Sequence, residues 1–355
     1  VPPKVQILEP KSGLLNQAGI ISVRVRVADQ GAGISAVGLL HNGHRLPDSA
    51  AEKLDDHTYL FKVRPVKGKN EFRATAFDSS RSVEARQDRV RVVAPHVEAR
   101  SPRLHLLSVG IDRYTSGLSL KFAEDDANSV SRLFKSELYQ DGRRVQLSNE
   151  QATLSGIKNA IADIAAEAEP QDAFVLYLAG HGTVVGEDYF FLPHDVKIET
   201  DEALVSSALS SEQLALSLRE VPATKQLLVL DSCRSGAAVG VVGRYFASRA
   251  GLEEVRSQQL LARASGTFLI AATKGEDYAY EIPELGHGVL TFAILESLGV
   301  ATNGSATVAK GGEGVTANDL LRSVSSRVPE LSEKYQGVRQ QVIQYSSGQD
   351  FLIAK

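Results

Sequence analysis

The sequence predicts two domains of different classes, an all-β sandwich followed by an α/β domain whose mostly parallel central sheet is flanked by helices. Up to about residue 94 the patterns are those of strands alone, whereas from residue 104 strands and helices alternate, which is typical of α/β domains. The 355 residues, 43% of them hydrophobic, suffice for two cores. We expect a sandwich over 1–94, a linker over 95–103 and an α/β domain over 104–355.

Alternation and turn residues predict the strands of the sandwich. Ile21 to Val27 alternates strictly between apolar and polar side chains, which predicts one buried and one solvated face. Asn42-Gly43 between apolar segments predicts a hairpin turn. Further strands, spaced as in a sandwich, are expected at Tyr59–Val66, Glu71–Phe77 and Arg89–Val93. This segment resembles a bacterial immunoglobulin-like domain, although it has no cysteine pair.

The first half of the α/β domain is predicted to alternate regularly. Its expected elements, in order, are a strand at Leu104–Ile111, a helix at Ala123–Ser136, a strand at Arg144–Leu147, a helix carrying Ile157, Ala160, Ile161, Ile164, Ala165 and Ala168 on one face, a strand at Phe174–Leu178, a strand at Asp188–Pro193, a helix opened by a capping-box pattern at Ser210–Gln213, and a strand at Leu227–Leu230. No Gly-rich phosphate loop follows the first strand, which disfavours a nucleotide-binding fold.

The second half begins with a polar, arginine-bearing segment, Ala237–Ser265, for which we expect a largely helical conformation. After it we expect a buried strand at Thr267–Ala272, a helix at Gly288–Leu298, a Gly-rich loop at Asn303–Gly314, a helix after Thr316 and a closing segment at Tyr345–Ile353.

Two uninterrupted apolar runs carry the chemistry. Phe174–Leu178 and Leu227–Leu230 are typical of parallel strands buried on both faces, and each is predicted to end at the carboxyl edge of the sheet. Open α/β sheets bind their ligands at that edge. His181, flanked by Gly180 and Gly182, follows the first run, and Cys233, the only cysteine, follows the second.

A cysteine and a histidine at one sheet edge predict nucleophilic catalysis, because a thiol needs a nearby base in order to ionise. Taken singly, Cys233 is explained as a small buried apolar residue and His181 as a structural one. Together they indicate a nucleophile and a general base. The glycines let backbone N–H groups approach a ligand, so those of Gly182 and Cys233 are expected to form an oxyanion hole.

The motifs Gly180-His181-Gly182 and Asp231–Gly236 resemble those of caspase-like cysteine peptidases, closest to the bacterial and metacaspase branch of the peptidase C14 type. Cys233 follows His181 by 52 residues, and in caspases this spacing is about 50 residues. The resemblance implies a large-subunit-like region over 104–236, an intersubunit-like linker over 237–265 and a small-subunit-like region over 266–355.

Specificity is predicted from Asp231, which shares a strand face with Cys233 because it lies two residues before it. A carboxylate there favours a basic substrate side chain. In metacaspases a second acid comes from an Asn-Asp-Ala element, which Asp125-Asp126-Ala127 resembles, with Asp126 at the matching position. The alternative for both Asp125 and Asp126 is a favourable interaction with the helix dipole.

Two departures from the metacaspase pattern follow the catalytic motifs. Arg234 replaces the usual histidine after the nucleophile and resembles the caspase motif. Thr183–Phe190 carries only Glu187 and Asp188, too few oxygen ligands for Ca²⁺. We therefore expect no metal and no other cofactor.

The segment 237–265 is predicted to carry sites of self-cleavage. If the enzyme cleaves after basic residues, the arginines that lie close to its own nucleophile in the sequence are tethered substrates. They are Arg244, Arg249, Arg256 and Arg263. The alternative is that they only solvate a helix.

Composition narrows the choice of partners. Residues 1–100 carry 16 Lys and Arg against 11 Asp and Glu, but without a dense basic run, so no nucleic acid partner is expected. No apolar run is long enough to span a membrane, and a reactive thiol favours the reducing cytosol. The chain begins Val-Pro-Pro without methionine, consistent with a fragment that lacks a leader or an N-terminal domain.

The sequence thus predicts a cysteine endopeptidase that acts on protein or peptide substrates after Arg or Lys. Cys233 and His181 are the expected dyad, and Asp126 and Asp231 the expected substrate-binding residues. The alternative is a catalytically silent caspase-like scaffold whose β-sandwich, or a region before Val1, binds a protein partner.

Overall fold

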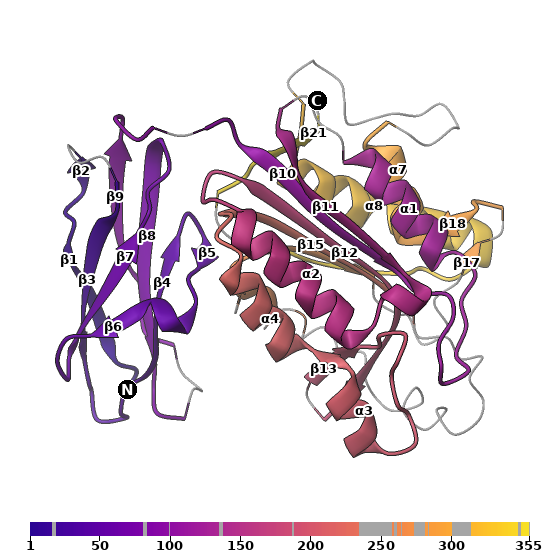
Figure 1. Cartoon of the computed structure of the whole chain (residues 1–355), viewed down its shortest axis with the longest axis horizontal. Helices are drawn as coiled ribbons and strands as arrows, with labels where there is room; N and C mark the ends of the chain where they lie inside the picture. The colour runs from indigo at the N-terminus through magenta and orange to yellow at the C-terminus, as the bar shows by residue number, and fades with distance from the viewer. Residues whose placement is uncertain are drawn as a thin grey trace.

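The protein is described from a computed structural model, in which an all-β body and an α/β body lie side by side (Figure 1). The structure describes residues 1–15, 19–80, 84–98, 100–134, 138–186, 188–233, 258, 261–263, 265–272, 281–282, 284–299, 314–346 and 349–354, with backbone only at 233, 281 and 282. Within these residues, no helix is long and apolar enough to cross a membrane.

The N-terminal body is a sandwich of a four-stranded and a five-stranded sheet, ordered β1-β3-β7-β6 and β2-β9-β8-β4-β5. Its strands are β1 (Lys4–Glu9), β2 (Gly13–Leu14), β3 (Ile21–Ala28), β4 (Ser35–His41), β5 (His44–Arg45), β6 (Ala51–Lys53), β7 (Thr58–Val63), β8 (Gly68–Phe77) and β9 (Asp88–Ala94). The valines of β3 are fully buried while Arg24 and Arg26 are exposed, as the alternation predicts. Asn42 and Gly43, with φ of 51° and 94°, form the β4–β5 turn.

The α/β body is built on a sheet in the order β11-β10-β12-β15-β16-β20, with only β20 antiparallel to its neighbour among these strands. They are β10 (Arg103–Gly110), β11 (Gln140–Ser148), β12 (Ala173–Val185), β15 (Lys225–Cys233), β16 (Phe268–Ala272) and β20 (Val342–Tyr345). Shorter pairs are β13 (Asp188–Phe191) with β14 (Leu209–Ser210), β17 (Glu281–Ile282) with β18 (His287–Gly288), and β19 (Val315–Thr316) with β21 (Leu352–Ala354).

Helices cover both faces of this sheet, as Figure 1 shows. They are α1 (Ala123–Leu133), α2 (Leu154–Glu167), α3 (Asp201–Ser207), α4 (Ser211–Glu220), α7 (Val289–Ser297) and α8 (Ala317–Gln336). Apolar side chains of α2 and α4 pack with Phe174, Leu176 and Leu178 of β12 on one face. Those of α1, α7 and α8 pack with Val175 and Tyr177 on the other. The alternation of side chains along β12 therefore determines which of its residues face α1 and α7.

The predicted α/β class with a mostly parallel sheet is confirmed, but two local expectations need correction. β12 does not end at His181; it continues to Val185, because beyond His181 it leaves β15 and pairs antiparallel with β13. The sequence patterns also did not predict α3, a short helix capped by Thr200. Most of 237–265 and of 303–314 lies outside the described residues.

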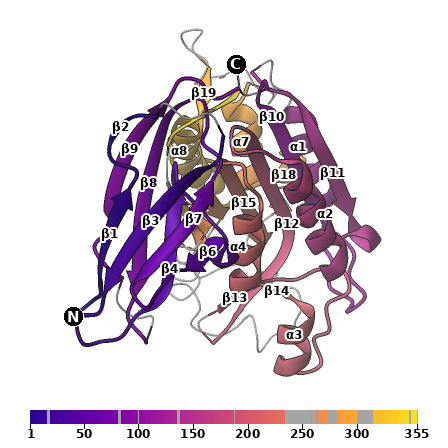
Figure 2. The same ribbon diagram turned by 60° about the vertical axis from the view of Figure 1, so that its left-hand side comes forward.

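The β4–β5 turn lies on the side of the sandwich that faces the α/β body (Figure 1), and Figure 2 shows both bodies with the sandwich turned forward. The carbonyl oxygen of Gly43 lies so close to Gly266 that a Cβ added there would be 2.1 Å away, and Asn42 accepts a hydrogen bond from the backbone of Gln349. The hairpin's His41 and His44 are buried, and burial lowers their pKa values to about 4 and about 3. The contact made by the β4–β5 turn is thus a close packing of backbone against backbone, next to two buried, uncharged histidines.

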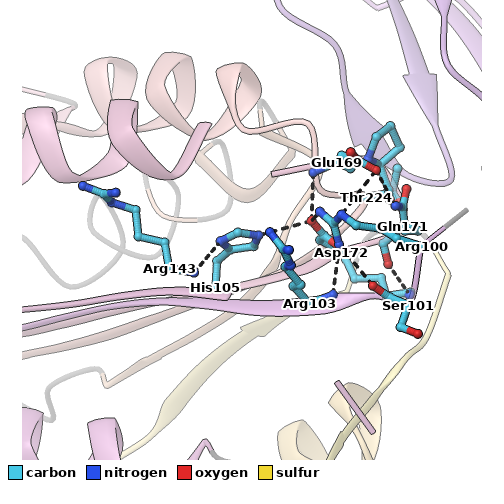
Figure 3. A network of polar contacts seen from close by, with 11 residues as sticks. Arg100, Ser101, Arg103, His105, Arg143, Glu169, Gln171, Asp172 and Thr224 are labelled. Atoms are coloured by element: carbon cyan, nitrogen blue, oxygen red, sulfur yellow. Dashed lines mark hydrogen bonds and ion pairs between the residues drawn. The ribbon is translucent and has the colours of Figure 1, made fainter. Parts of the chain in front are cut away.

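Asp172, at the start of β12, ties the linker to the sheet (Figure 3). Its fully buried carboxylate accepts two hydrogen bonds from Arg100, at 2.8 and 2.6 Å, and others from the backbone N–H groups of Arg103 and Glu169. His105 Nδ1 accepts the Arg143 N–H, so its Nε2–H donates to Asp172 at 3.2 Å. Burial alone would raise the pKa of Asp172, but these donors outweigh it and hold the pKa well below its usual range.

We predict that Asp172→Ala lowers the free energy of unfolding by about 3 kcal/mol, because it strands the buried partners of a charged network. Chemical denaturation at pH 7 measures this loss. Since the folded pKa of Asp172 is depressed, the wild-type advantage is present above about pH 4 and shrinks as the pH falls below it.

The control is Asp163→Ala, which removes an exposed carboxylate paired with Arg143 at 2.7 Å. An exposed ion pair contributes under about 1 kcal/mol. Equal losses in the two variants would contradict the role given to Asp172.

Candidate active site

His181 and Cys233 lie opposite each other in the sheet. β12 and β15 pair in parallel without a shift from Ala173 and Lys225 to His181 and Cys233, which form the last pair of the ladder. At this point β12 turns away to pair with β13, and its next residue, Gly182, faces Phe191. The two chemically reactive residues therefore sit where two buried strands diverge, at the carboxyl edge of the parallel sheet.

Tyr114, after β10, supports His181 from one side. The backbone N–H of His181 donates to the Tyr114 hydroxyl oxygen at 2.8 Å, and the two ring centroids are 5.0 Å apart. His181 is fully buried in this arrangement. The hydrogen bond and the ring contact together hold His181 at the point where β12 leaves β15.

The glycines beside His181 are required by close packing. A Cβ added to Gly180 would lie 2.7 Å from the hydroxyl of Tyr114, and one added to Gly182 would lie 2.7 Å from that of Tyr189. The Tyr189 hydroxyl in turn donates to Ser232 Oγ at 2.9 Å. Side chains larger than hydrogen would displace the groups that position His181.

Two carboxylates converge a short distance away, around the N-terminus of α7. A Cβ added to Gly288 would be 2.9 Å from Asp126 Oδ2 and 3.3 Å from Asp231 Oδ2. Asp126 comes from α1 and Asp231 from β15, two residues before Cys233. The acid pair Asp126 and Asp231, on elements far apart in sequence, thus shares one small space that only a glycine at 288 leaves open.

Asp126 is held by the segment that precedes α7. Its Oδ1 lies 2.7 Å from His287 Nδ1, and its Oδ2 accepts the Gly288 N–H at 3.0 Å. Burial, with the nearby charge of Asp231, raises its pKa to about 7, and the hydrogen bonds from His287 and Gly288 oppose this shift. Asp125, its neighbour in the first turn of α1, is exposed, which distinguishes the two acids.

Asp231 is held by Thr291 in the first turn of α7 and by Tyr177 on β12. Its Oδ2 accepts hydrogen bonds from Thr291 Oγ1 at 2.7 Å and from the Tyr177 hydroxyl at 3.4 Å. Burial raises the pKa of Asp231, and these hydrogen bonds oppose the shift. The backbone N–H of Thr291 also donates to this carboxylate, so the first turn of α7 holds Asp231 with two of its groups.

The sequence pointed to His181, Cys233, Asp126 and Asp231, which the structure places near one edge of the sheet, but not to the residues that contact them. The missed residues are Tyr114, Tyr177, Tyr189, Ser232, His287 and Thr291. One signal was available: His287-Gly288 immediately precedes a helix and repeats the His-Gly pair of His181-Gly182. Arg234, Arg244, Arg249 and Arg256 lie outside the described residues, and in the described part of the chain no cluster of acids, histidines or cysteines suits a metal ion.

The family model of the caspase domain, peptidase C14, matches residues 103–351, which is nearly all of the α/β body and includes the motifs around His181 and Cys233. The chain belongs to the caspase domain family. Among curated proteins, no sequence matches this chain significantly. The caspase domain here has a cysteine-peptidase-type fold with the histidine and the cysteine of its motifs present.

Solved structures similar to this chain share little sequence with it. A Geobacter sulfurreducens protein is 15% identical, with a TM-score of 0.46, over 70% of this chain and 94% of its own. Caspase-1 from Spodoptera frugiperda is 11% identical, with a TM-score of 0.42, over 72% and 91%. Fibronectin(III)-like modules of Clostridium thermocellum CbhA match 28% of this chain and 51% of their own, at 21% identity and a TM-score of 0.23.

We predict that Asp126→Asn changes how stability depends on pH. The pKa of Asp126 is about 7 when folded, above its unfolded value, so its favourable contribution is full below about pH 4 and is lost as the pH rises through 7. Relative to wild type, the variant should gain on the order of 2 kcal/mol between pH 5 and pH 8. Denaturant unfolding at both pH values measures the gain.

The matched control is Asp125→Asn on the same helix turn, which should leave the pH dependence unchanged because Asp125 is exposed. A gain in Asp126→Asn that does not vary with pH would contradict the raised pKa.

Proposed function

We propose that this protein is a cysteine endopeptidase that hydrolyses peptide bonds after Arg or Lys in protein or peptide substrates. The observation that carries the proposal is the in-register pairing of His181 and Cys233 where β12 leaves β15, with Asp231 two residues before the cysteine. Membership of the caspase domain family supports the cysteine-peptidase chemistry. We place the activity in the cytosol, where a reactive thiol persists.

The proposed reaction uses His181 as base and then as acid. His181 takes the thiol proton, and the Cys233 sulfur attacks the scissile carbonyl to form a tetrahedral oxyanion, stabilised by the N–H groups of Gly182 and Cys233. Collapse breaks the C–N bond, and His181 protonates the leaving amine. Water, deprotonated by His181, then hydrolyses the thioester and regenerates the thiol.

The acid pair is the proposed site for the basic substrate side chain. Asp231 supplies one carboxylate to the bound cation, and Asp126 adds a second across Gly288. A planar guanidinium offers several donors to two carboxylates, whereas an ammonium offers a point charge. An acidic side chain would meet two buried carboxylates and is excluded by repulsion.

The alternative is a scaffold in which the acids only cap α7 and the sandwich binds a partner. Both carboxylates accept donors from the first turn of α7, which fits capping. However, burial beside each other raises both pKa values, a cost that a cap alone does not require. The presence of both dyad residues also favours the enzyme.

We predict that Cys233→Ala and His181→Ala each abolish hydrolysis of a peptide with Arg before the scissile bond, because each removes half of the dyad. Thermal unfolding should show that both variants stay folded. Asp231→Asn should reduce kcat/KM for the Arg peptide by at least about tenfold, the loss of one charged hydrogen bond. Turnover that survives in either dyad variant, or a preference for Asp peptides, would refute the proposal.

The linker is the proposed site of self-cleavage. Arg263 lies in helical residues 261–263, and its guanidinium pairs with Glu84 of the sandwich at 2.8 Å. Cleavage requires an extended chain, so this arginine must leave both the helix and Glu84 first. We therefore rank Arg244, Arg249 and Arg256 ahead of Arg263 as sites.

We predict that purified wild-type protein converts into a large fragment that ends at one of these arginines and a small C-terminal fragment. The two should stay associated, because β15 and β16 share a sheet across the linker. Intact-mass measurement over time identifies the site. Cys233→Ala should remain a single chain. Cuts after Asp or Glu, or cuts that persist in Cys233→Ala, would contradict cleavage by the protein's own site.

A further inference from the structure

His287 is a partly buried histidine that contacts Asp126 of the acid pair. The proposed reaction gives it no role. Its side chain is only 22% exposed, and Nδ1 lies 2.7 Å from Asp126 Oδ1. An ionised carboxylate can only accept hydrogen bonds, so when Asp126 is charged the hydrogen lies on Nδ1 and is donated to Asp126. The strand pair β17–β18, in which His287 pairs with Ile282, holds the ring against α1.

The environment of Asp126 works against its charge. It is 3% exposed, and the carboxylate of Asp231 lies on the other side of Gly288. A carboxyl group in such a place takes up a proton unless donors hold its charged form. Asp126 has two donors in the described structure, the Gly288 N–H and His287, and only the second is a side chain.

We infer that His287 is a positioning residue that keeps Asp126 ionised and aimed at the bound cation, and so sets the pH range in which the pocket accepts a basic side chain. This inference rests on the proposed function and specifies its regulation. Lowering the pH removes one negative charge from the pocket when Asp126 takes up a proton. Cation binding therefore strengthens as the pH rises through about 7, the pKa of Asp126.

The other titratable groups described around Asp126 do not account for the effect expected of His287. Within the described part of the chain, the titratable groups that act on Asp126 are His287 and Asp231, and those that act on Asp231 are Tyr177 and His287. Tyr177 acts on Asp231 as a hydroxyl donor. Asp231 is held by Thr291 and Tyr177 rather than by His287, so changing His287 acts mainly through Asp126.

Two variants of His287 separate its donor from its bulk. In His287→Asn the amide nitrogen takes the place of Nδ1 and still donates to Asp126, but it carries no charge. In His287→Leu the volume is kept and the donor is lost. The probe is benzamidine, a planar cation without a scissile bond, titrated by calorimetry from pH 6 to pH 9. All measurements use the Cys233→Ala protein, so that the ionisation of the thiol does not contribute.

We expect benzamidine to bind severalfold more tightly at pH 8 than at pH 6, with a midpoint near 7. His287→Leu should move the midpoint up by about one unit and weaken binding at pH 7 about fivefold, because the charged fraction of Asp126 falls from about half to about one-tenth. Binding at pH 9 should recover to near the wild-type value. His287→Asn should keep the wild-type midpoint.

A His287→Leu variant that weakens binding equally at every pH, with an unmoved midpoint, would overturn the inference and leave His287 a packing role. So would a His287→Asn variant that behaves like His287→Leu. The absence of benzamidine binding at any pH would instead overturn the proposed basic specificity, on which the inference rests.

Discussion

The unshifted ladder between β12 and β15 is the constraint on which the site depends. Nine consecutive pairs, from Ala173 and Lys225 onward, carry the register to His181 and Cys233. Because side chains alternate along a strand, a slip of one residue would move Asp231 to the opposite face, away from α1 and α7. The hydrogen bonds of Asp172 fix the start of the same strand to the linker. One strand, β12, therefore positions both the linker and the edge that carries His181.

The N-terminus of α7 completes what the sheet begins. Gly288 and Thr291 donate to carboxylates from two other elements, and the helix dipole favours negative charge at this end. These donors offset part of the cost of burying two acids together. Because burial raises both pKa values, the two acids lower the stability of the folded protein, a cost that a bound cation would relieve.

The fold class and the family were predictable because they depend on local signals. Uninterrupted apolar runs, helical periodicity and the Asn42-Gly43 turn identify the elements, and the spacing of His181 and Cys233 identifies the family. The continuation of β12 past His181 was not predictable, because it depends on pairing with β13, a partner chosen by tertiary packing. Tyr114 and His287 were missed for the same reason: neither lies near its partner in sequence, and each is a common residue with no motif of its own.

The central claim is that the strand ends form a peptidase site with an adjoining pocket for a basic side chain. Mass spectrometry of the protein after treatment with peptidyl halomethyl ketones, one ending in Arg and one in Asp, tests both parts at once. The account predicts a single adduct on Cys233 with the Arg reagent, slowed by benzamidine, and little reaction with the Asp reagent. Equal labelling by both reagents, or no labelling of Cys233 in folded protein, would contradict it.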